Sequence, residues 1–159
     1  MSDYIIIIPV FNNVDRFKRY TYKFVTKYNL KSKCVLLIQN DKSKNIITIF
    51  VASAEQKKIY EEEIGTDYKI VVGVKGISNI RNFITNYYPS GKKILCIDDD
   101  ISKIVKGEPT GMKLTKVTNL KTLASNGFNL CKKHGYALWG LHPSPNPRSL
   151  KSNNKITNT

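Results

Sequence analysis

The run YIIII, from Tyr4 to Ile8, is apolar at every position. A short run of this kind predicts a central β-strand covered on both faces, because a strand with one wet face alternates apolar and polar residues. Such a strand has to lie inside a layered domain, so the rest of the chain must supply its neighbours. Further strand-like segments occupy residues 34–38, 46–52, 68–74, 92–97 and 136–141.

Helical patterns separate these segments, at residues 16–28, 53–64, 78–88 and 119–135. Ser53 and Gln56 fit the S-x-x-Q capping box, which marks a helix start. Strands that alternate with helices predict an α/β fold with a mostly parallel sheet. We expect one compact domain over residues 1–148 and a polar, mobile tail over 149–159.

The chain is strongly basic, with 26 basic and 12 acidic residues in 159 and a formal net charge of +14. Such a charge favours phosphate-bearing partners, but a lysine-rich surface of no particular purpose explains it equally well. There is no run of 18 apolar residues and no signal-peptide pattern, so we expect no membrane partner. The cysteines, Cys34, Cys96 and Cys131, lack metal-type spacing, which predicts buried free thiols in a reducing compartment.

Three consecutive carboxylates, Asp98 to Asp100, directly follow the strand-like segment 92–97. In an extended chain Asp98 and Asp100 point the same way and Asp99 points the other way. Two carboxylates about 5 Å apart repel by roughly 3 kcal/mol at an effective dielectric near 20, so a proton, a basic residue or a metal ion must offset the cost. Oxygen ligands favour Mg²⁺ or Mn²⁺. The alternatives are a general acid–base pair, or a solvated turn in which Asp100 caps a helix.

In parallel sheets ligands bind beyond the carboxyl ends of the strands. The segment from Pro9 to Phe11 leaves the first strand there, and the aspartates leave a later one, so both can build one site. Arg81 and Asn82 lie on the polar side of the helix before the aspartates, where they can reach a diphosphate or a nucleoside, although two such residues are more often an ordinary surface pair. No P-loop, G-x-S-x-G or H-E-x-x-H motif is present.

Two features near the C-terminus are weaker candidates. Trp139 and Gly140 can form a stacking wall, and His142 can serve as a base or a metal ligand. Each also has an ordinary explanation, because a single tryptophan usually packs in a core and a lone loop histidine usually has no chemical role.

The segments IIIIPVFNN, IRN and ILCIDDDI, in this order, resemble the nucleotide-sugar half of a GT-A fold glycosyltransferase. In that fold a D-x-D motif follows the fourth strand and binds a divalent cation on the donor diphosphate. The segments IFVASAEQKKIY, IVVGVKGISNIRN and ALWGLHPSPNP are similar to small glycosyltransferases associated with oxygenases that hydroxylate DNA bases, found largely in phages and large DNA viruses. The resemblance covers residues 4–148.

This resemblance implies a GT-A fold, with a Rossmann-like, mostly parallel sheet flanked by helices. It implies an enzyme that needs Mn²⁺ or Mg²⁺. The absence of a signal-peptide pattern and of a long apolar run predicts a location in the cytoplasm or the host-cell interior. The reaction would move a sugar from a nucleoside-diphosphate sugar, a UDP-sugar, to an acceptor such as a hydroxylated DNA base. By this resemblance the nucleoside would contact Pro9, Val10 and Phe11, and the rest of the donor would contact Arg81, Asn82, Asp98 and Asp99. The metal would bind Asp98 and Asp100, which are also the catalytic candidates together with His142. The acceptor would contact Trp139 and Gly140.

The chain departs from the family pattern in two places. The segment 34–45 looks like extra length, and no Asp or Glu follows Glu108, where these enzymes commonly place a late metal ligand and, in inverting members, a base. The missing carboxylate fits a truncated product, a minimal enzyme that uses His142 or a partner, or a nucleotide-sugar or nucleic-acid binding module without turnover. Two further hypotheses stay open independently of it: the same chemistry on a protein or glycan acceptor, and a nucleotidyltransferase.

Overall fold

The fold is taken from a computed structural model, which describes residues 4–10, 13–27, 47–65, 68–107 and 113–141. The chain divides into two compact units, Met1–Ser102 and Lys103–Thr159, where the sequence predicted one domain over 1–148. The boundary follows the aspartates directly, so all three carboxylates belong to the first unit. The two units are described separately below.

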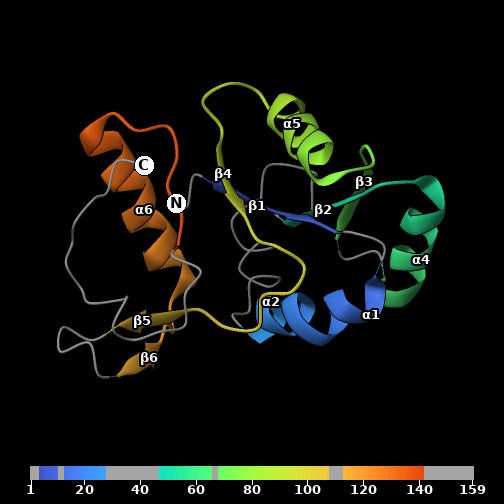
Figure 1. The fold of residues 1–159 in the computed structure, drawn as a ribbon, viewed down its shortest axis with the longest axis horizontal. Helices are drawn as coiled ribbons and strands as arrows, with labels where there is room; N and C mark the ends of the chain where they lie inside the picture. The colour runs from blue at the N-terminus through green and yellow to red at the C-terminus, as the bar shows by residue number, and fades with distance from the viewer. Residues whose placement is uncertain (1–3, 11–12, 28–46, 66–67, 108–112, 142–159) are drawn as a thin grey trace, which may run out of the picture. The chain divides into compact units, whose positions relative to one another are not determined.

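The first unit is built on a parallel sheet of four strands in the order β3-β2-β1-β4 (Figure 1). The α/β prediction is therefore confirmed at the level of a parallel sheet flanked by helices, an arrangement compatible with a Rossmann-like fold. The segment 34–38 lies outside the described residues. The strands are β1 (Tyr4–Pro9), β2 (Ile47–Val51), β3 (Lys69–Val72) and β4 (Lys93–Cys96).

Strand β1 is central, as its apolar run predicted. Ile6 pairs with Ile47 of β2 on one side and with Leu95 of β4 on the other. Ile6, Ile7 and Ile8 are at most 1% exposed. The sheet thus depends on a strand with no face in water.

The helices cover both faces of this sheet, and the strand order explains how. The connections from β1 to β2 and from β2 to β3 run in one direction across the sheet, and the connection from β3 to β4 runs back past β1. Because crossover connections between parallel strands are right-handed, connections that run in opposite directions have to lie on opposite faces of the sheet. In Figure 1 α5 lies on the face opposite α1, α2 and α4. The helical segments are α1 (Val14–Phe17), η1 (Lys18–Tyr22), α2 (Lys23–Lys27), α4 (Ala54–Ile64) and α5 (Ile77–Tyr87).

The capping box predicted for α4 is present. The Ser53 side chain accepts a hydrogen bond from the Gln56 backbone N–H at 3.3 Å, and the Gln56 side chain accepts one from the Ala52 N–H at 2.9 Å. The reciprocal bond goes to Ala52 instead of Ser53, so the cap also fixes the end of β2. On the α5 face, Ile7, Phe50, Ile80 and Ile84 form a buried core.

The helix after β1 contains a π-helical segment, η1, that the sequence did not indicate. A π turn is wider than an α turn and rotates less per residue. Counted from the buried Phe17, the smaller rotation per residue therefore places Thr21, and not Tyr20, on the buried face of the helix. Thr21 is fully buried, whereas Tyr20, whose spacing with Phe17 and Phe24 predicts a place on the apolar face, is 37% exposed.

The second unit contains a hairpin, β5 (Val105–Gly107) with β6 (Leu114–Lys116), and one long helix, α6 (Leu120–His134). The helix was predicted, and it begins at Asn119, whose side chain accepts a hydrogen bond from the Thr122 N–H at 2.9 Å. It ends at Gly135, which has a left-handed backbone. None of the helices in the described stretches is long and apolar enough to cross a membrane.

Two local predictions were wrong. Residues 136–141 form no strand, and Leu138 there is 86% exposed, so the segment gains nothing from the burial that favours a strand. Cys96 is exposed, although it lies within strand β4 and was predicted to be buried. Cys131 is buried as expected, and Cys34 lies outside the described residues.

Trp139 packs on a notch in α6 made by a glycine. A Cβ atom added to Gly127 would lie 2.5 Å from Cδ2 of the Trp139 ring. The ring also meets Phe128 edge-on, with centroids 5.6 Å apart. Within its own unit, Trp139 therefore has a packing role against α6.

Replacing Gly127 with alanine is expected to destabilise the second unit by about 1–2 kcal/mol, because the ring has to move away from the new methyl group. In an open helix the same change would stabilise by about 1 kcal/mol. Gly140→Ala is the control, since a Cβ there meets nothing within 4 Å. Thermal unfolding followed by the fluorescence of the single tryptophan measures both variants, and equal stability of the two would refute the packing role.

Candidate functional site

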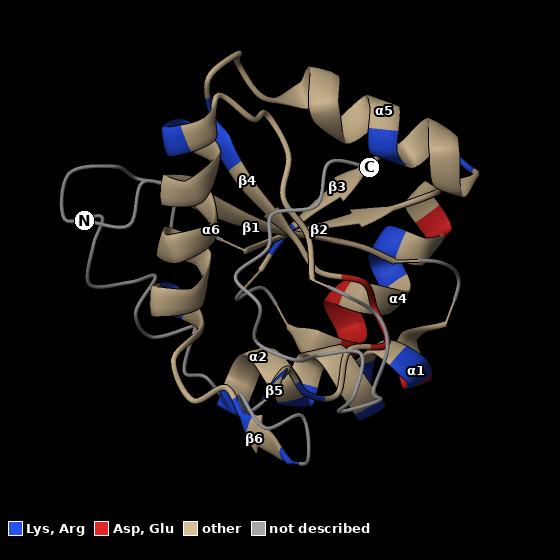
Figure 2. Ribbon diagram, turned by 60° about the vertical axis from the view of Figure 1, so that its left-hand side comes forward, with Lys and Arg blue, Asp and Glu red and all other residues tan. Residues whose placement is uncertain are grey.

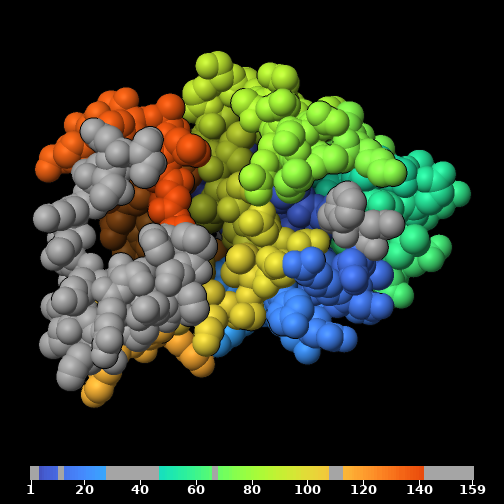
Figure 3. Space-filling view, viewed as in Figure 1, coloured from blue at the N-terminus to red at the C-terminus, as the bar shows by residue number. Residues whose placement is uncertain are grey.

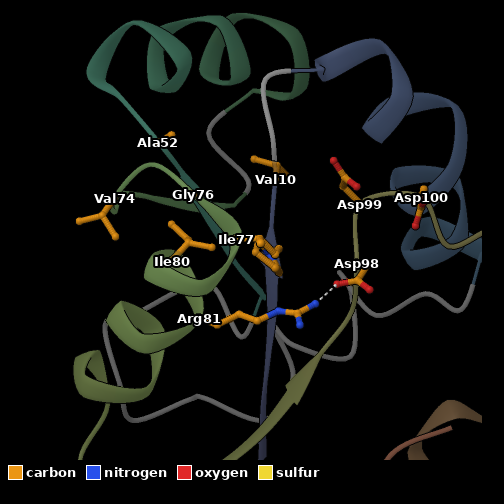
Figure 4. A pocket seen from close by; sticks show the side chains of 11 residues that line it. Val10, Ala52, Val74, Gly76, Ile77, Ile80, Arg81, Asp98, Asp99 and Asp100 are labelled. Atoms are coloured by element: carbon orange, nitrogen blue, oxygen red, sulfur yellow. Dashed lines mark ion pairs between the residues drawn. The ribbon is translucent and has the colours of Figure 1, made fainter.

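A cavity of about 170 Å³ lies where the strand order reverses, beyond the carboxyl ends of β1 and β4 (Figure 4). Ligands of open parallel sheets bind at this point, because the loops that leave the two strands diverge to opposite faces and leave a crevice. The lining residues are Pro9, Val10, Ala52, Val74, Gly76, Ile77, Ile80, Arg81, Asp98, Asp99 and Asp100.

The cavity has an apolar side and a charged side. Val10 leaves β1 on one side of it, and Val74 and Ile77 lie across from the aspartates in Figure 4. Ile77 is 57% exposed, although its spacing with Ile80 and Ile84 in the sequence predicts that it lies on the buried face of the helix. An exposed isoleucine beside a cavity offers a contact surface to a flat apolar group of a ligand.

The N-terminus of α5 also lies at the cavity. Its cap residue, Gly76, has φ +100°, a conformation that side chains rarely adopt, and no side chain caps the first turn. Backbone N–H groups at such a helix end favour an anion. Arg81, one turn further along α5, adds a positive charge to the same wall.

The aspartates form a turn and do not continue the strand. Strand β4 ends at Cys96, and Asp99 and Asp100 are in a turn. The prediction that Asp98 and Asp100 share a direction rested on extended backbone, which is absent here. Asp98 faces Arg81, with 3.5 Å between its Oδ1 and the arginine Nη2, as the dashed line in Figure 4 marks.

Asp100 is paired with Arg16 of α1 instead. The hydrogen bond to Asp100, followed by the charges of Asp100 and Asp99, raises the pKa of Arg16 above its ordinary value. Figure 3 shows the yellow segment after β4 at the surface next to the blue helix α1. Two arginines from opposite faces of the sheet therefore offset the repulsion within the triplet.

Asp99 is the half-buried member of the triplet. Its charge acts on Tyr60 of α4, whose ring packs against Phe17 with centroids 5.7 Å apart. Burial first, and then the charge of Asp99, raises the pKa of Tyr60. Tyr60 therefore stays protonated beside this carboxylate.

The side chains at the cavity limit how a divalent cation could bind there. Among the described residues no group of three or more His, Cys, Asp or Glu side chains is placed to hold a metal ion. Mg²⁺ needs fewer, because it usually binds through one or two carboxylates and takes water and substrate phosphate as its other ligands. Asp98 and Asp100 are both exposed at the cavity, and they are the carboxylates that would supply such oxygen ligands.

The structure brings most of the predicted donor residues together. Pro9, Val10, Arg81 and the aspartates line one cavity, but Asn82 is exposed and is not part of its lining. Phe11 and His142 lie outside the described residues. Trp139 and Gly140 belong to the second unit.

Sequence reasoning missed Arg16 and Ile77 as site residues. Nothing in the sequence distinguishes Arg16 from the many other basic residues of the chain. Only the fold shows that it pairs with Asp100. Ile77 was assigned to the core because its spacing matches the apolar face of α5. The signal that could have shown its position is Gly76, since a glycine just before a helix often marks a close approach.

Comparisons with protein-family models, with curated proteins and with solved structures find no match for this chain. The likeness to GT-A glycosyltransferases therefore stays a prediction from sequence patterns.

Proposed function

We propose that this chain is a metal-dependent glycosyltransferase of GT-A type that takes a nucleoside-diphosphate sugar as donor. The observation that carries the proposal is the cavity between the ends of β1 and β4, where an apolar wall, an uncapped helix end and three carboxylates meet. A nucleotide sugar has the matching parts: a flat base, a diphosphate and sugar hydroxyls.

Each part of the donor has a chemically matching set of residues in the cavity. The base lies against Val10 and Ile77, and the diphosphate lies at the start of α5 beside Arg81. The cavity of about 170 Å³ is smaller than the roughly 300–1,000 Å³ of most ligand sites, so it holds the nucleoside while the sugar extends outside it.

Asp98 and Asp100 are the residues that would hold Mn²⁺ or Mg²⁺. A bound divalent cation neutralises the charge that develops on the leaving nucleoside diphosphate. Arg81 orients Asp98 and contributes positive charge to the same side of the cavity.

The charge of the second unit supports a polyanionic acceptor such as DNA with hydroxylated bases. Its described residues, 103–107 and 113–141, contain no Asp or Glu (Figure 2). A surface of one sign attracts a phosphate backbone without reading its sequence. The lysines in these stretches are Lys103, Lys106, Lys113, Lys116, Lys121, Lys132 and Lys133.

One observation favours a second candidate, a nucleotide-sugar binding module without turnover. Asp98 and Asp100 are both paired with arginines, so the triplet is compensated without a metal. The described part of the second unit also offers no carboxylate as a base.

Asp100→Asn is expected to lower the hydrolysis of a UDP-sugar in the presence of Mn²⁺ by at least about tenfold, because the cation loses a ligand. Release of UDP without an acceptor measures this. Asp15→Asn is the control, since Asp15 is an exposed carboxylate of the same unit and not part of the cavity lining. No hydrolysis by the wild-type protein with any UDP-sugar would favour the binding module.

Arg16→Gln is expected to tighten the binding of Mn²⁺ by about fivefold, because the arginine and the cation compete for the Asp100 carboxylate. Arg19→Gln removes the same charge from the same helical segment without touching the Asp100 pair, and it should change the affinity less than twofold. Isothermal titration with Mn²⁺ alone measures both. Equal effects of the two variants would refute the competition.

Duplex DNA is expected to bind the protein at low salt. Its affinity should fall by roughly a hundredfold between about 50 and 200 mM salt, as about four phosphate contacts would give. Fluorescence anisotropy with a labelled duplex measures it. Absence of binding at low salt would rule out the DNA acceptor and leave the same chemistry on a protein or a glycan.

A further inference from the structure

The hydroxyl group of Thr21 bridges the two ends of the aspartate turn. It donates a hydrogen bond to the backbone carbonyl of Asp98 at 2.7 Å and accepts one from the backbone N–H of Ile101 at 2.9 Å. The three carboxylates lie between these two anchor points. One side chain from the helix after β1 thus holds the whole turn.

A buried hydroxyl in this position needs an explanation. Thr21 is 0% exposed, and among the described residues Thr48 is the other buried threonine. Burial of a hydroxyl is unfavourable unless hydrogen bonds replace its lost water, and Thr21 uses both its donor and its acceptor capacity. An apolar side chain would pack there at no such cost, so the bonds to the turn are what the threonine supplies.

The local helix geometry delivers Thr21 to this place. Thr21 lies in the π-helical segment η1, and π turns are rare and occur frequently at functional sites. The less tightly wound turn directs Thr21 toward the sheet and Tyr20 toward solvent. From α1, which directly precedes η1, Arg16 reaches the Asp100 carboxylate itself.

We propose that Thr21 is a positioning residue for the aspartate turn, acting through the backbone of Asp98 and Ile101 to set the directions of the Asp98 and Asp100 carboxylates. Its effect on ligand binding rests on the proposed function, whereas its effect on the turn does not. The two can therefore be measured separately.

The decisive comparison uses the full-length protein and three substitutions. Thr21→Val keeps the shape but removes both hydrogen bonds, and Thr21→Ser keeps the hydroxyl. Thr48→Val is the matched control, because it removes the other buried threonine hydroxyl, which lies in β2 away from the turn. All measurements are made well below the unfolding temperature of each variant.

The first measurement needs no ligand. We expect Thr21→Val to speed the exchange of the Ile101 amide hydrogen by at least about tenfold and to shift the backbone signals of residues 98–101. Thr21→Ser and Thr48→Val should leave both unchanged. Unchanged Ile101 exchange in Thr21→Val, or an equal effect of Thr48→Val on residues 98–101, would overturn the proposal.

The second measurement is the affinity for UDP in the presence of Mn²⁺. We expect Thr21→Val to weaken it by about tenfold, with Thr21→Ser restoring it to within about twofold of wild type. Equal losses in the valine and serine variants would show that packing, not hydrogen bonding, matters, and would overturn the proposal. If the wild-type protein binds no UDP with Mn²⁺, the proposed function fails while the exchange data still decide the role of Thr21.

A folding failure is also informative. If Thr21→Val does not fold, Thr21→Ala takes its place, because it also lacks the hydroxyl and has a smaller side chain. If neither folds while Thr48→Val does, Thr21 is a folding determinant and the positioning role is overturned.

Discussion

The pairing of β1 between β2 and β4 is the constraint on which the rest of the first unit depends. A strand with hydrogen-bonded neighbours on both edges and helices on both faces has to be apolar throughout, and the isoleucines of β1 meet that demand. Because the chain goes out to β3 and then returns to β4, the strand order reverses at β1. The loops after β1 and β4 separate there, and the cavity follows from that separation.

The carboxylates at this crevice are compensated from two directions. Arg81 comes from α5 on one face and Arg16 from α1 on the other. In this chain of net charge +14, two of the basic side chains therefore neutralise carboxylates of the acidic turn. Under the proposed function, a cation bound at Asp98 and Asp100 would have to share these carboxylates with the two arginines, so the binding of metal and the binding of phosphate would be linked.

The sequence predicted the features that depend on residues close together in the chain, and it missed those that depend on contacts between distant residues. The apolar run of β1 and the Ser53 cap are local signals, and both were confirmed. The β5–β6 hairpin was missed because its strands have three residues each, too few for a pattern. The π turn at Thr21 and the Arg16–Asp100 pair, 84 residues apart, depend on the folded chain. No propensity or spacing in either segment indicates them.

The place of Thr21 has a consequence for how the chain can vary. Ile101, which it anchors, is the second-last residue of the first unit. The side chain that anchors Ile101 lies 80 residues earlier in the chain, also in the first unit. The first unit therefore contains both the acidic turn and its anchor, so a substitution at Thr21 alters the turn from within the same unit.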